Sequence, residues 1–321
     1  MTHASFLNRR SLMTLMASAL VAPMAAASPA PRILATTGMI ADAARRLTGL
    51  EVTALMGPGM DPHGYRQTRS DIAAMARADL VLWHGLYLEA QMEDFLTELA
   101  RNRPVVAVAD ALPKQMLRAH DIYPDRYDPH VWMDPTLWAD VVDIIAATLG
   151  KTFPALADKA QTEAAVMRAD ITGLQTYAQQ VLASVPAERR LLVTAHDAFG
   201  YFGRAYGFEV QGIQGLSTES EAGLARVTEL VDLLVDRKIP AVFVETSVSD
   251  RSIRALIEGA AAQGHEVRIG GALYSDAMGP DGTYEGTWLG MIDHNVTTIA
   301  RALGGAAPER GRMDQLAQVA G

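Results

Sequence analysis

Short runs of β-branched and other apolar residues alternate with helical segments over most of this 321-residue chain. Strands that alternate with helices favour a parallel sheet, because each helix carries the chain back to the edge where the next strand begins. Four strands are predicted in each half of the chain: 32–37, 51–57, 79–85, 104–110, 189–195, 208–215, 241–246 and 265–273. The pattern therefore predicts an α/β fold of two lobes, each with a four-stranded, mainly parallel sheet flanked by helices.

Residues 155–185 interrupt this alternation. The segment contains no proline and a single glycine, Gly173, and its apolar side chains recur at helical spacing. A helix of about thirty residues would extend roughly 45 Å, well beyond the average for globular proteins. We therefore predict one long, rigid helix that joins the two lobes. The predicted order is N-terminal lobe, linking helix, C-terminal lobe and flexible tail: 31–151, 152–186, 187–305 and 306–321.

Local signals also predict where individual helices begin. Asp134 and Pro135 stand ahead of an apolar periodic run, which predicts an N-cap followed by proline at the first helical position. Thr218 and Glu221 have the spacing of a capping box, which predicts a helix over 217–238.

Residues 1–27 have the layout of a cleaved export signal. The pair Arg9-Arg10 precedes an apolar run and a small-residue end, and the run is too short for a membrane span. The segment NRRSLM resembles a twin-arginine signal; an ordinary secretory signal that carries two arginines is the alternative. We therefore expect export, and a periplasmic location in a bacterium.

The composition excludes several classes of function. The chain has no cysteine, which excludes thiolate metal sites, cysteine nucleophiles and a lipidated cysteine after the signal. We therefore expect no membrane anchor of its own. The formal net charge of −9 makes nucleic acid a poor partner, while small cations are attracted.

The tripeptide Asp-Pro-His occurs twice, at residues 61–63 and 128–130. Proline fixes its own φ and restricts the residue before it, so each copy is predicted to be a stiff loop that presents an imidazole. On spacing alone, His63 and His130 are the two histidines that stand out.

Two further candidates, His196 and Asp276, also follow directly after predicted strands. Ligands of open α/β sheets bind at the carboxyl ends of the strands, so all four side chains are expected at the cleft between the lobes. Three imidazoles and a carboxylate suit Zn²⁺ and also Mn²⁺ or Fe²⁺. Four protein ligands make a closed site, which favours holding a metal over hydrolysis.

The other histidines have weaker claims to a role. His3 lies in the signal, His120 in a polar loop, and His265 and His294 in polar company within or beside helices. His84 also stands at a strand end, and a role in supporting a ligand is left open for it.

Four stretches carry a resemblance to a known family. They are 57–89, 127–135 (YDPHVWMDP), 191–223 and 274–299, and they cover much of the chain in family order. Together they resemble the cluster A-I solute-binding proteins of zinc and manganese ABC importers, often called the ZnuA/TroA family. The resemblance implies two α/β lobes on a rigid backbone helix.

The resemblance also implies a ligand set, which falls on His63, His130, His196 and Asp276. At the third position, members that resemble manganese binders often have Glu, whereas this chain has His196 within TAHDAF. A third imidazole favours Zn²⁺ over Mn²⁺. Many zinc-specific members carry a His-rich loop before the second Asp-Pro-His; here only His120 stands there, which keeps manganese open. The family usually has Asn in place of His84, so no role is carried over to His84.

These observations predict a periplasmic solute-binding protein rather than an enzyme. It is expected to capture one divalent transition metal ion, with Zn²⁺ favoured, Mn²⁺ next and Fe²⁺ last. Its expected partner is the membrane permease of an ABC importer, and the protein is expected to be a monomer.

Three alternatives stay open. The first is a manganese-specific member of the same family. The second is a metal-dependent hydrolase that uses Glu219, Glu221 or Glu245 as its base, which would require an open coordination position with a carboxylate aimed at it. The third is an adhesin.

Overall fold

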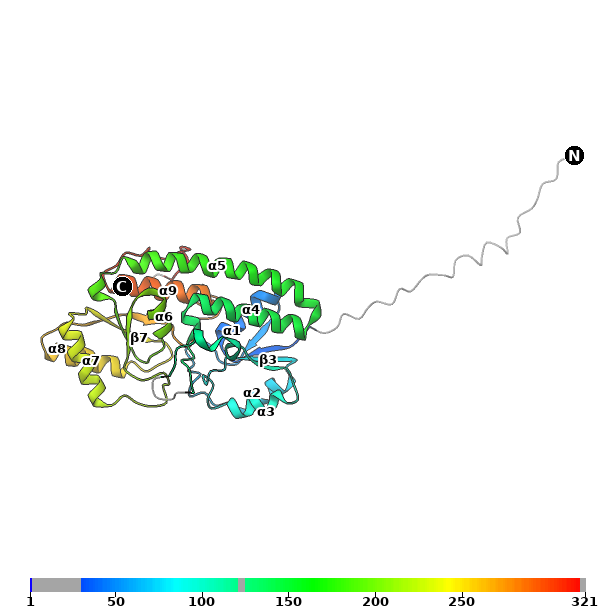
Figure 1. Ribbon diagram of the computed structural model, residues 1–321, viewed down its shortest axis with the longest axis horizontal. Helices are drawn as coiled ribbons and strands as arrows, with labels where there is room; N and C mark the ends of the chain where they lie inside the picture. The colour runs from blue at the N-terminus through cyan, green and yellow to red at the C-terminus, as the bar shows by residue number, and fades with distance from the viewer. Residues whose placement is uncertain (2–29, 121–124, 318–321) are drawn as a thin grey trace. The chain divides into compact units, whose positions relative to one another are not determined.

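The computed structural model of the chain describes Met1, residues 30–120 and residues 125–317. Apart from Met1, the predicted export signal therefore lies outside the described residues. The ribbon in Figure 1 shows strands and helices interleaved through both halves of the described chain.

Four parallel strands form the sheet of the N-terminal half, in the order β2-β1-β3-β4. Their bounds are β1 (Ile33–Ala35), β2 (Val52–Ala54), β3 (Leu80–Trp83) and β4 (Val105–Ala107). Side chains alternate across the central strands: Ile33 and Leu82 join the main core, whereas Leu34 and Val81 join a smaller apolar cluster. Both faces are thus apolar, as expected for a parallel sheet that is covered on both sides.

Local sequence signals set the bounds of the N-terminal helices, which are α1 (Gly38–Thr48), α2 (Arg69–Arg77), α3 (Glu93–Ala100) and α4 (Pro135–Thr152). Gly49 ends α1 in the left-handed region at φ 68°, a conformation that glycine adopts without strain. Asp134 caps α4, since its carboxylate accepts a hydrogen bond from the Thr136 N–H at 2.9 Å. The predicted start of α4 is therefore confirmed.

Helix α5 (Ala157–Ala183) is the longest helix of the described chain, with 27 residues. It packs against α4 and α1 from the N-terminal half and against α9 (Trp288–Ala302) from the C-terminal half, and Figure 1 shows it lying along α4 and α9. A buried stripe at helical spacing makes these contacts, including Ala160, Ala164, Met167, Ile171, Leu174 and Ala178. The predicted long connecting helix is confirmed.

The C-terminal half contains four further strands, β5 (Leu191–Thr194), β6 (Glu209–Gly212), β7 (Ala241–Glu245) and β8 (Arg268–Leu273). They pair in parallel as β5-β6 and β7-β8, with β5 lying beside β7, so the expected four strands are present as two ladders. The β7-β8 register shifts because Gly270 is an extra residue opposite Val242 and Phe243. A Cβ on Gly270 would come within 2.7 Å of the Phe243 ring, so only glycine fits this bulge without a shift.

The helices α6 (Gly200–Tyr206), α7 (Leu224–Asp236), α8 (Arg251–Ala262) and α9 cover these strands. Helix α7 begins at Leu224 with Gly223 at its N-cap, so the predicted helix start at 217 and its capping box were wrong. Other contacts hold this segment as a loop: the Gln214 amide donates to the Thr218 and Ser220 carbonyls, and the Thr218 hydroxyl donates to the Asp61 carboxylate. Residues 214–223 form an irregular loop.

Three buried tryptophans connect the two halves. The Trp132 indole Nε1–H donates to the Ser275 carbonyl at 2.8 Å, and the Trp288 indole Nε1–H donates to the Trp132 carbonyl at 3.0 Å. Trp138 stacks on Trp288 with ring centroids 5.9 Å apart. All three belong to one continuous core with strands of both halves, which opposes large movements of one half against the other.

The segment after Gly305 was predicted to be a flexible tail, and the structure describes it to residue 317. Leu316 is buried, and the Arg312 N–H donates to the Asp293 carboxylate at 2.9 Å. Short 3-10 turns complete the described elements: Ala109–Ala111, Lys114–Met116, Val131–Met133, Pro154–Leu156 and Ala187–Arg189. Among the described helices, none is long and apolar enough to span a membrane. The predicted lobe boundaries stay predictions.

Candidate metal centre

Four buried side chains meet where the strands of both halves end. His63 and His130 lie in loops beyond β2 and β4, His196 stands two residues after β5, and Asp276 stands three residues after β8. Each is at most 3% exposed. One nitrogen or oxygen from each side chain lies within 4.8 Å of the others. The structure therefore brings together all four residues singled out from the sequence.

The distances between these atoms suit a four-coordinate metal ion. His63 Nε2 lies 3.3 Å from His130 Nε2. Asp276 places Oδ1 3.4 Å from His130 Nε2 and Oδ2 3.2 Å from His196 Nε2. Nitrogen and oxygen ligands held about 2.0–2.1 Å from a tetrahedral Zn²⁺ are separated by about 3.3–3.4 Å. These three separations therefore match those between the ligands of an ion of this size.

The polar atoms that face the centre of the cage lack other partners. His196 Nε2 and both carboxylate oxygens of Asp276 are buried and have no aligned hydrogen bond within the described chain. Buried polar groups are normally satisfied, and the exceptions require an explanation. A cation bound between these atoms would satisfy them.

A local carboxylate supports each Asp-Pro-His loop. The Asp61 Oδ1 accepts a hydrogen bond from the His63 backbone N–H at 2.9 Å, and Asp128 Oδ1 accepts one from the His130 N–H at the same distance. Asp128 Oδ1 also lies 2.8 Å from His130 Nδ1, which leaves Nε2 to face the cage. The tautomer and orientation of a metal-binding histidine are commonly fixed in this way.

Asp128 is itself held by two side chains. The Arg118 guanidinium donates to Asp128 Oδ2 at 3.1 Å, and the Tyr201 hydroxyl donates to the Asp128 carbonyl at 2.9 Å. Because Asp128 is 1% exposed, Arg118 also offsets a buried negative charge.

Glu245 supports His196 from a distant part of the sequence. Its Oε1 accepts a hydrogen bond from the His196 N–H at 2.8 Å, and its Oε2 lies 2.6 Å from His196 Nδ1. This second contact is close but off the axis of a hydrogen bond. Glu245 therefore sits behind the imidazole, on the side away from the cage. The sequence had suggested Glu245 only as a candidate base, because nothing in the pattern links it to His196.

The pKa values of the four residues show how the cage balances charge. Burial opposes the charged form of His130, but its contacts with Asp128 and Asp276 outweigh burial and raise its pKa to about 9. Burial opposes the charged form of His196 too, but the charges of Glu245 and Asp276 raise its pKa well above the usual value. For His63, burial dominates and lowers the pKa to about 3. Burial disfavours ionised Asp276, yet His196 and His130 hold its pKa well below the usual value.

These directions divide the imidazoles into two kinds in the absence of a metal. His130 and His196 keep protons near neutral pH, whereas His63 is neutral. A divalent cation would replace the two protons on the atoms that face the cage, so binding is coupled to proton release.

His84 is a supporting residue to which the sequence assigned no role. It is buried, its Nε2 lies 2.7 Å from the Pro129 carbonyl, and its ring meets the Trp132 ring edge-on at 4.9 Å. Burial lowers its pKa to about 3, so the ring is neutral and its Nε2–H donates to that carbonyl. His84 thus braces the peptide directly before His130, which only the folded chain reveals.

The remaining described histidines lie outside the cage. His265 Nε2 bonds to the Ile239 carbonyl and His294 Nε2 to the Ala272 carbonyl. His120 lines a cavity of about 360 Å³ that also reaches His63.

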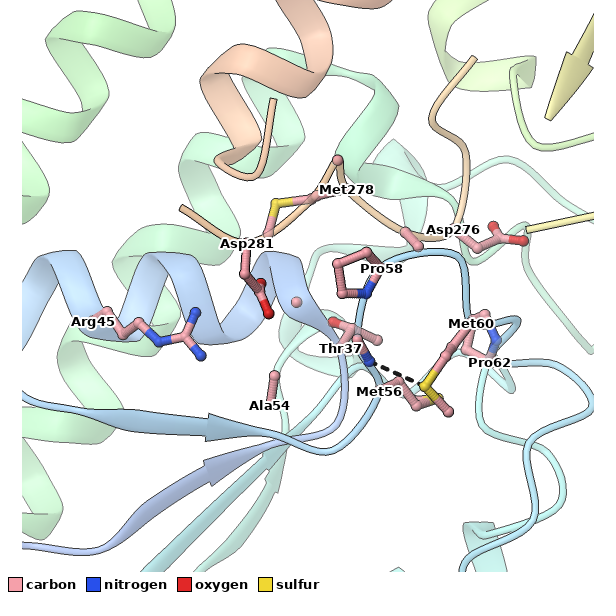
Figure 2. A pocket seen from close by; sticks show the side chains of 14 residues that line it. Thr37, Arg45, Ala54, Met56, Pro58, Met60, Pro62, Asp276, Met278 and Asp281 are labelled. Carbon is pink, nitrogen blue, oxygen red and sulfur yellow. Dashed lines mark hydrogen bonds between the residues drawn. The ribbon is translucent and has the colours of Figure 1, made fainter. Parts of the chain in front are cut away.

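A smaller cavity of about 140 Å³ reaches Asp276 from another side. Figure 2 shows Asp276 at one end of its lining and Arg45 with Asp281 at the other. The methionines Met56, Met60 and Met278 also line it, and the Gly57 N–H donates to Met60 Sδ at 3.2 Å. This cavity beside Asp276 is therefore lined by both charged and apolar side chains.

Comparison with known proteins gives one family and close relatives. The family model described as "ZnuA: Zinc-uptake complex component A periplasmic" matches residues 33–302. The manganese-binding lipoprotein MntA of Bacillus subtilis is 48% identical over 275 residues, which cover 85% of this chain and 89% of the relative. The zinc-binding protein TroA of Treponema pallidum is 44% identical over 282 residues, which cover 87% of this chain and 91% of the relative.

The fold is also similar to a solved structure. The periplasmic zinc-binding protein TroA from Treponema pallidum superposes with a TM-score of 0.83 at 43% sequence identity. The match covers 85% of this chain and 99% of that chain.

Proposed function

Because this chain belongs to the ZnuA family, whose relatives include metal-binding proteins of ABC transporters, we propose that it captures one divalent transition metal ion and delivers it to an importer. The proposed ligands are His63, His130 and His196 through Nε2, and Asp276 through its carboxylate. The metal is the cargo of the protein rather than a resident cofactor. The proposed partner is the membrane permease of the importer.

The observation that carries this proposal is the spacing of the cage. Four buried donor atoms from both halves of the molecule converge, with neighbouring atoms 3.2–3.4 Å apart. Burying three imidazoles around a carboxylate costs free energy unless a charge compensates them. A bound cation supplies that compensation and explains why the chain maintains such a cluster.

Zn²⁺ is the favoured cargo. Three imidazole nitrogens and one carboxylate, at separations that suit a tetrahedron, are typical of zinc, whereas Mn²⁺ prefers more oxygen ligands and a higher coordination number. Fe²⁺ is the least favoured of the three.

Manganese is the second candidate, for a specific reason. The relative that is 48% identical bears the name manganese-binding lipoprotein, while the relative named for zinc is 44% identical. Both carboxylate oxygens of Asp276 face the cage, so a bidentate contact could enlarge the coordination shell toward one that Mn²⁺ accepts.

The setting proposed for this activity is the periplasm. The export signal predicted over residues 1–27 and the family description both support it. We propose a transport role without catalysis, because Glu245 lies behind His196 and thus away from any position where a substrate water would meet the metal.

The test is metal binding by the purified protein. We expect one equivalent of Zn²⁺ per chain by mass spectrometry, and competition titrations should rank Zn²⁺ above Mn²⁺. The double variant His63→Ala/His196→Ala should lose this binding. The matched control His265→Ala/His294→Ala removes two histidines outside the cage and should keep it.

Two results would overturn parts of this proposal. Full metal retention in the cage variant would sink the ligand assignment. Mn²⁺ binding that survives a zinc challenge would reverse the metal preference while leaving the transport role in place.

A further inference from the structure

The loop of residues 214–223 connects β6 to α7 and covers one side of the cage. All of its residues are exposed or half-buried, and Ala222, near its end, packs against the main core. The Gln214 side chain braces the loop internally, since its amide donates to the Ser220 carbonyl at 3.2 Å. Its backbone joins the C-terminal half through Gln214 N–H, which donates to the Ala195 carbonyl at 2.9 Å.

Two side-chain hydrogen bonds tie this loop to the N-terminal half. The Thr218 hydroxyl donates to Asp61 Oδ2, and the Gln91 amide donates to Glu219 Oε1 at 2.7 Å. The partners are 157 and 128 residues apart in sequence. Both bonds therefore cross between the two halves.

The Asp61 carboxylate is shared between the loop and a proposed ligand. Its Oδ2 accepts from Thr218, while its Oδ1 accepts from the His63 backbone N–H at 2.9 Å. A shift of the 214–223 loop would therefore release one side of the carboxylate that orients the His63 loop.

Cavities lie on both sides of the 214–223 loop. One, of about 360 Å³, is lined by His63 together with Leu216, Ser217 and Ser220. The other, of about 590 Å³, is lined by Asp61 together with Gln214 and Thr218. The loop thus lines two cavities, one of which reaches His63 and the other Asp61.

We propose that Thr218 is a positioning residue for metal retention. Through Asp61 it holds the His63 loop in place, and the same hydrogen bond keeps the 214–223 loop closed against the N-terminal half. The Gln91–Glu219 hydrogen bond adds a second, more exposed tie. Movement of this loop then opens the cage, while the shared tryptophan core and α5 keep the two halves fixed. This inference rests on the proposed metal binding at His63.

The test is the rate at which Zn²⁺ leaves the protein. Thr218→Val keeps the shape of the side chain but removes the hydroxyl donor. A hydrogen bond to a charged group is worth on the order of tenfold or more in an equilibrium constant, so we expect Zn²⁺ dissociation into excess chelator to speed up by about tenfold. Thr218→Ser retains the donor and should restore the wild-type rate.

Thr228→Val is the matched control. Thr228 lies on α7 in the same half, and its hydroxyl donates to the Leu224 carbonyl within its own helix. This variant should leave the dissociation rate unchanged. Thr218→Val and Thr228→Val each remove one hydrogen bond from the metal-free fold and should each lower its melting temperature slightly. Faster release in Thr218→Val alone then separates retention from a general loss of stability.

A double-mutant cycle tests whether Thr218 acts through Asp61. In an Asp61→Ala background, Thr218→Val should have no further effect on dissociation, because the two residues form one unit. Equal rates for wild type and Thr218→Val would overturn the inference, as would full additivity with Asp61→Ala. If the wild-type protein binds neither Zn²⁺ nor Mn²⁺, the proposed function itself fails, and this outcome is distinct from the other two.

Discussion

The two Asp-Pro-His loops have the same local structure but different surroundings. In both, the aspartate accepts a hydrogen bond at 2.9 Å from the backbone N–H of the histidine two residues later. Asp128 also contacts the ring of its own histidine and is held by Arg118 and Tyr201. Asp61 instead turns its second oxygen to Thr218, on a loop whose residues are all exposed or half-buried.

This difference teaches that a repeated motif need not have one role. The second copy lies in the core and fixes His130 from several directions. The first copy lies beside the 214–223 loop, and its support depends on a contact from the other half of the molecule. We therefore propose that His130 is the fixed ligand and His63 the one that moves when the proposed cargo is released.

Removing each aspartate in turn tests most directly whether Asp128 supports His130 more strongly than Asp61 supports His63. Asp128→Ala takes an acceptor from the His130 N–H and ring and leaves Arg118 without its partner. Supporting residues of this kind commonly affect metal affinity by about 10–100-fold. We therefore expect Zn²⁺ affinity to fall by about 100-fold in Asp128→Ala and by about tenfold in Asp61→Ala. Competition titration with Zn²⁺ measures both. A larger loss for Asp61→Ala would contradict the assignment of His130 as the fixed ligand.

The C-terminal half sharpens the comparison, since Glu245 supports His196 from 49 residues away. Glu245→Gln keeps the shape but removes the charge that raises the pKa of His196. We expect the affinity for Zn²⁺ to fall by about tenfold at neutral pH. The charge also holds a proton on His196 in the metal-free protein, so fewer protons should be released on binding. Calorimetry in buffers of different ionisation enthalpy counts these protons, and an unchanged count would contradict the role of Glu245.

Whether a candidate ligand is held by residues near it in sequence or far from it also explains what could be predicted from the sequence. His63 and His130 stood out because their stiff loops and carboxylates are encoded within three residues. The start of α4 was predicted for the same reason, since Asp134 and Pro135 are adjacent. His196 and Asp276 were candidates through their places after predicted strands, and the family resemblance completed their assignment, because no motif within a few residues marks them.

The failures have the same physical origin. The capping box at Thr218 was wrong because contacts with Gln214 and with Asp61, 157 residues away, hold this segment as a loop. The position of Glu245 behind His196 could not be predicted, because no local signal links the two. For His84 the strand end left a supporting role open, but its contact with the Pro129 carbonyl depends on the fold. The eight strands were predicted because each depends on a pattern of a few consecutive residues. The pairing of the C-terminal strands as β5-β6 and β7-β8 was not predicted, because it depends on packing between distant segments.

The pKa values predict opposite pH responses from the two Asp-Pro-His histidines. His130 has a pKa raised to about 9 in the metal-free fold, so its contribution to stability is full below its ordinary value of 6.5 and is lost as pH rises through 9. The raised pKa of His196 acts in the same direction. His63, with a pKa lowered to about 3, contributes stability above pH 6.5 that is lost as pH falls toward 3.

We therefore expect the melting temperature of the metal-free protein to fall between pH 6.5 and pH 9, on the order of 5 °C. Saturating Zn²⁺ should remove most of this fall, because the ion takes the place of the protons on His130 and His196. Thermal scans at several pH values, with chelator and with Zn²⁺, measure the difference. A metal-free melting temperature that rises over this interval would contradict the charge balance described for the cage.

The smallest expected effect concerns His84, which separates support by a hydrogen bond from support by packing. Its Nε2–H donates to the Pro129 carbonyl directly before His130, and its ring packs against Trp132. His84→Leu fills similar space but leaves that buried carbonyl without a donor, so we expect about a threefold loss of Zn²⁺ affinity and a lower melting temperature. His84→Gln places an amide donor near the position of Nε2 and should retain affinity close to that of the wild type. Equal losses in the two variants would mean that the ring matters only as packing, and that His130 is held by Asp128 alone.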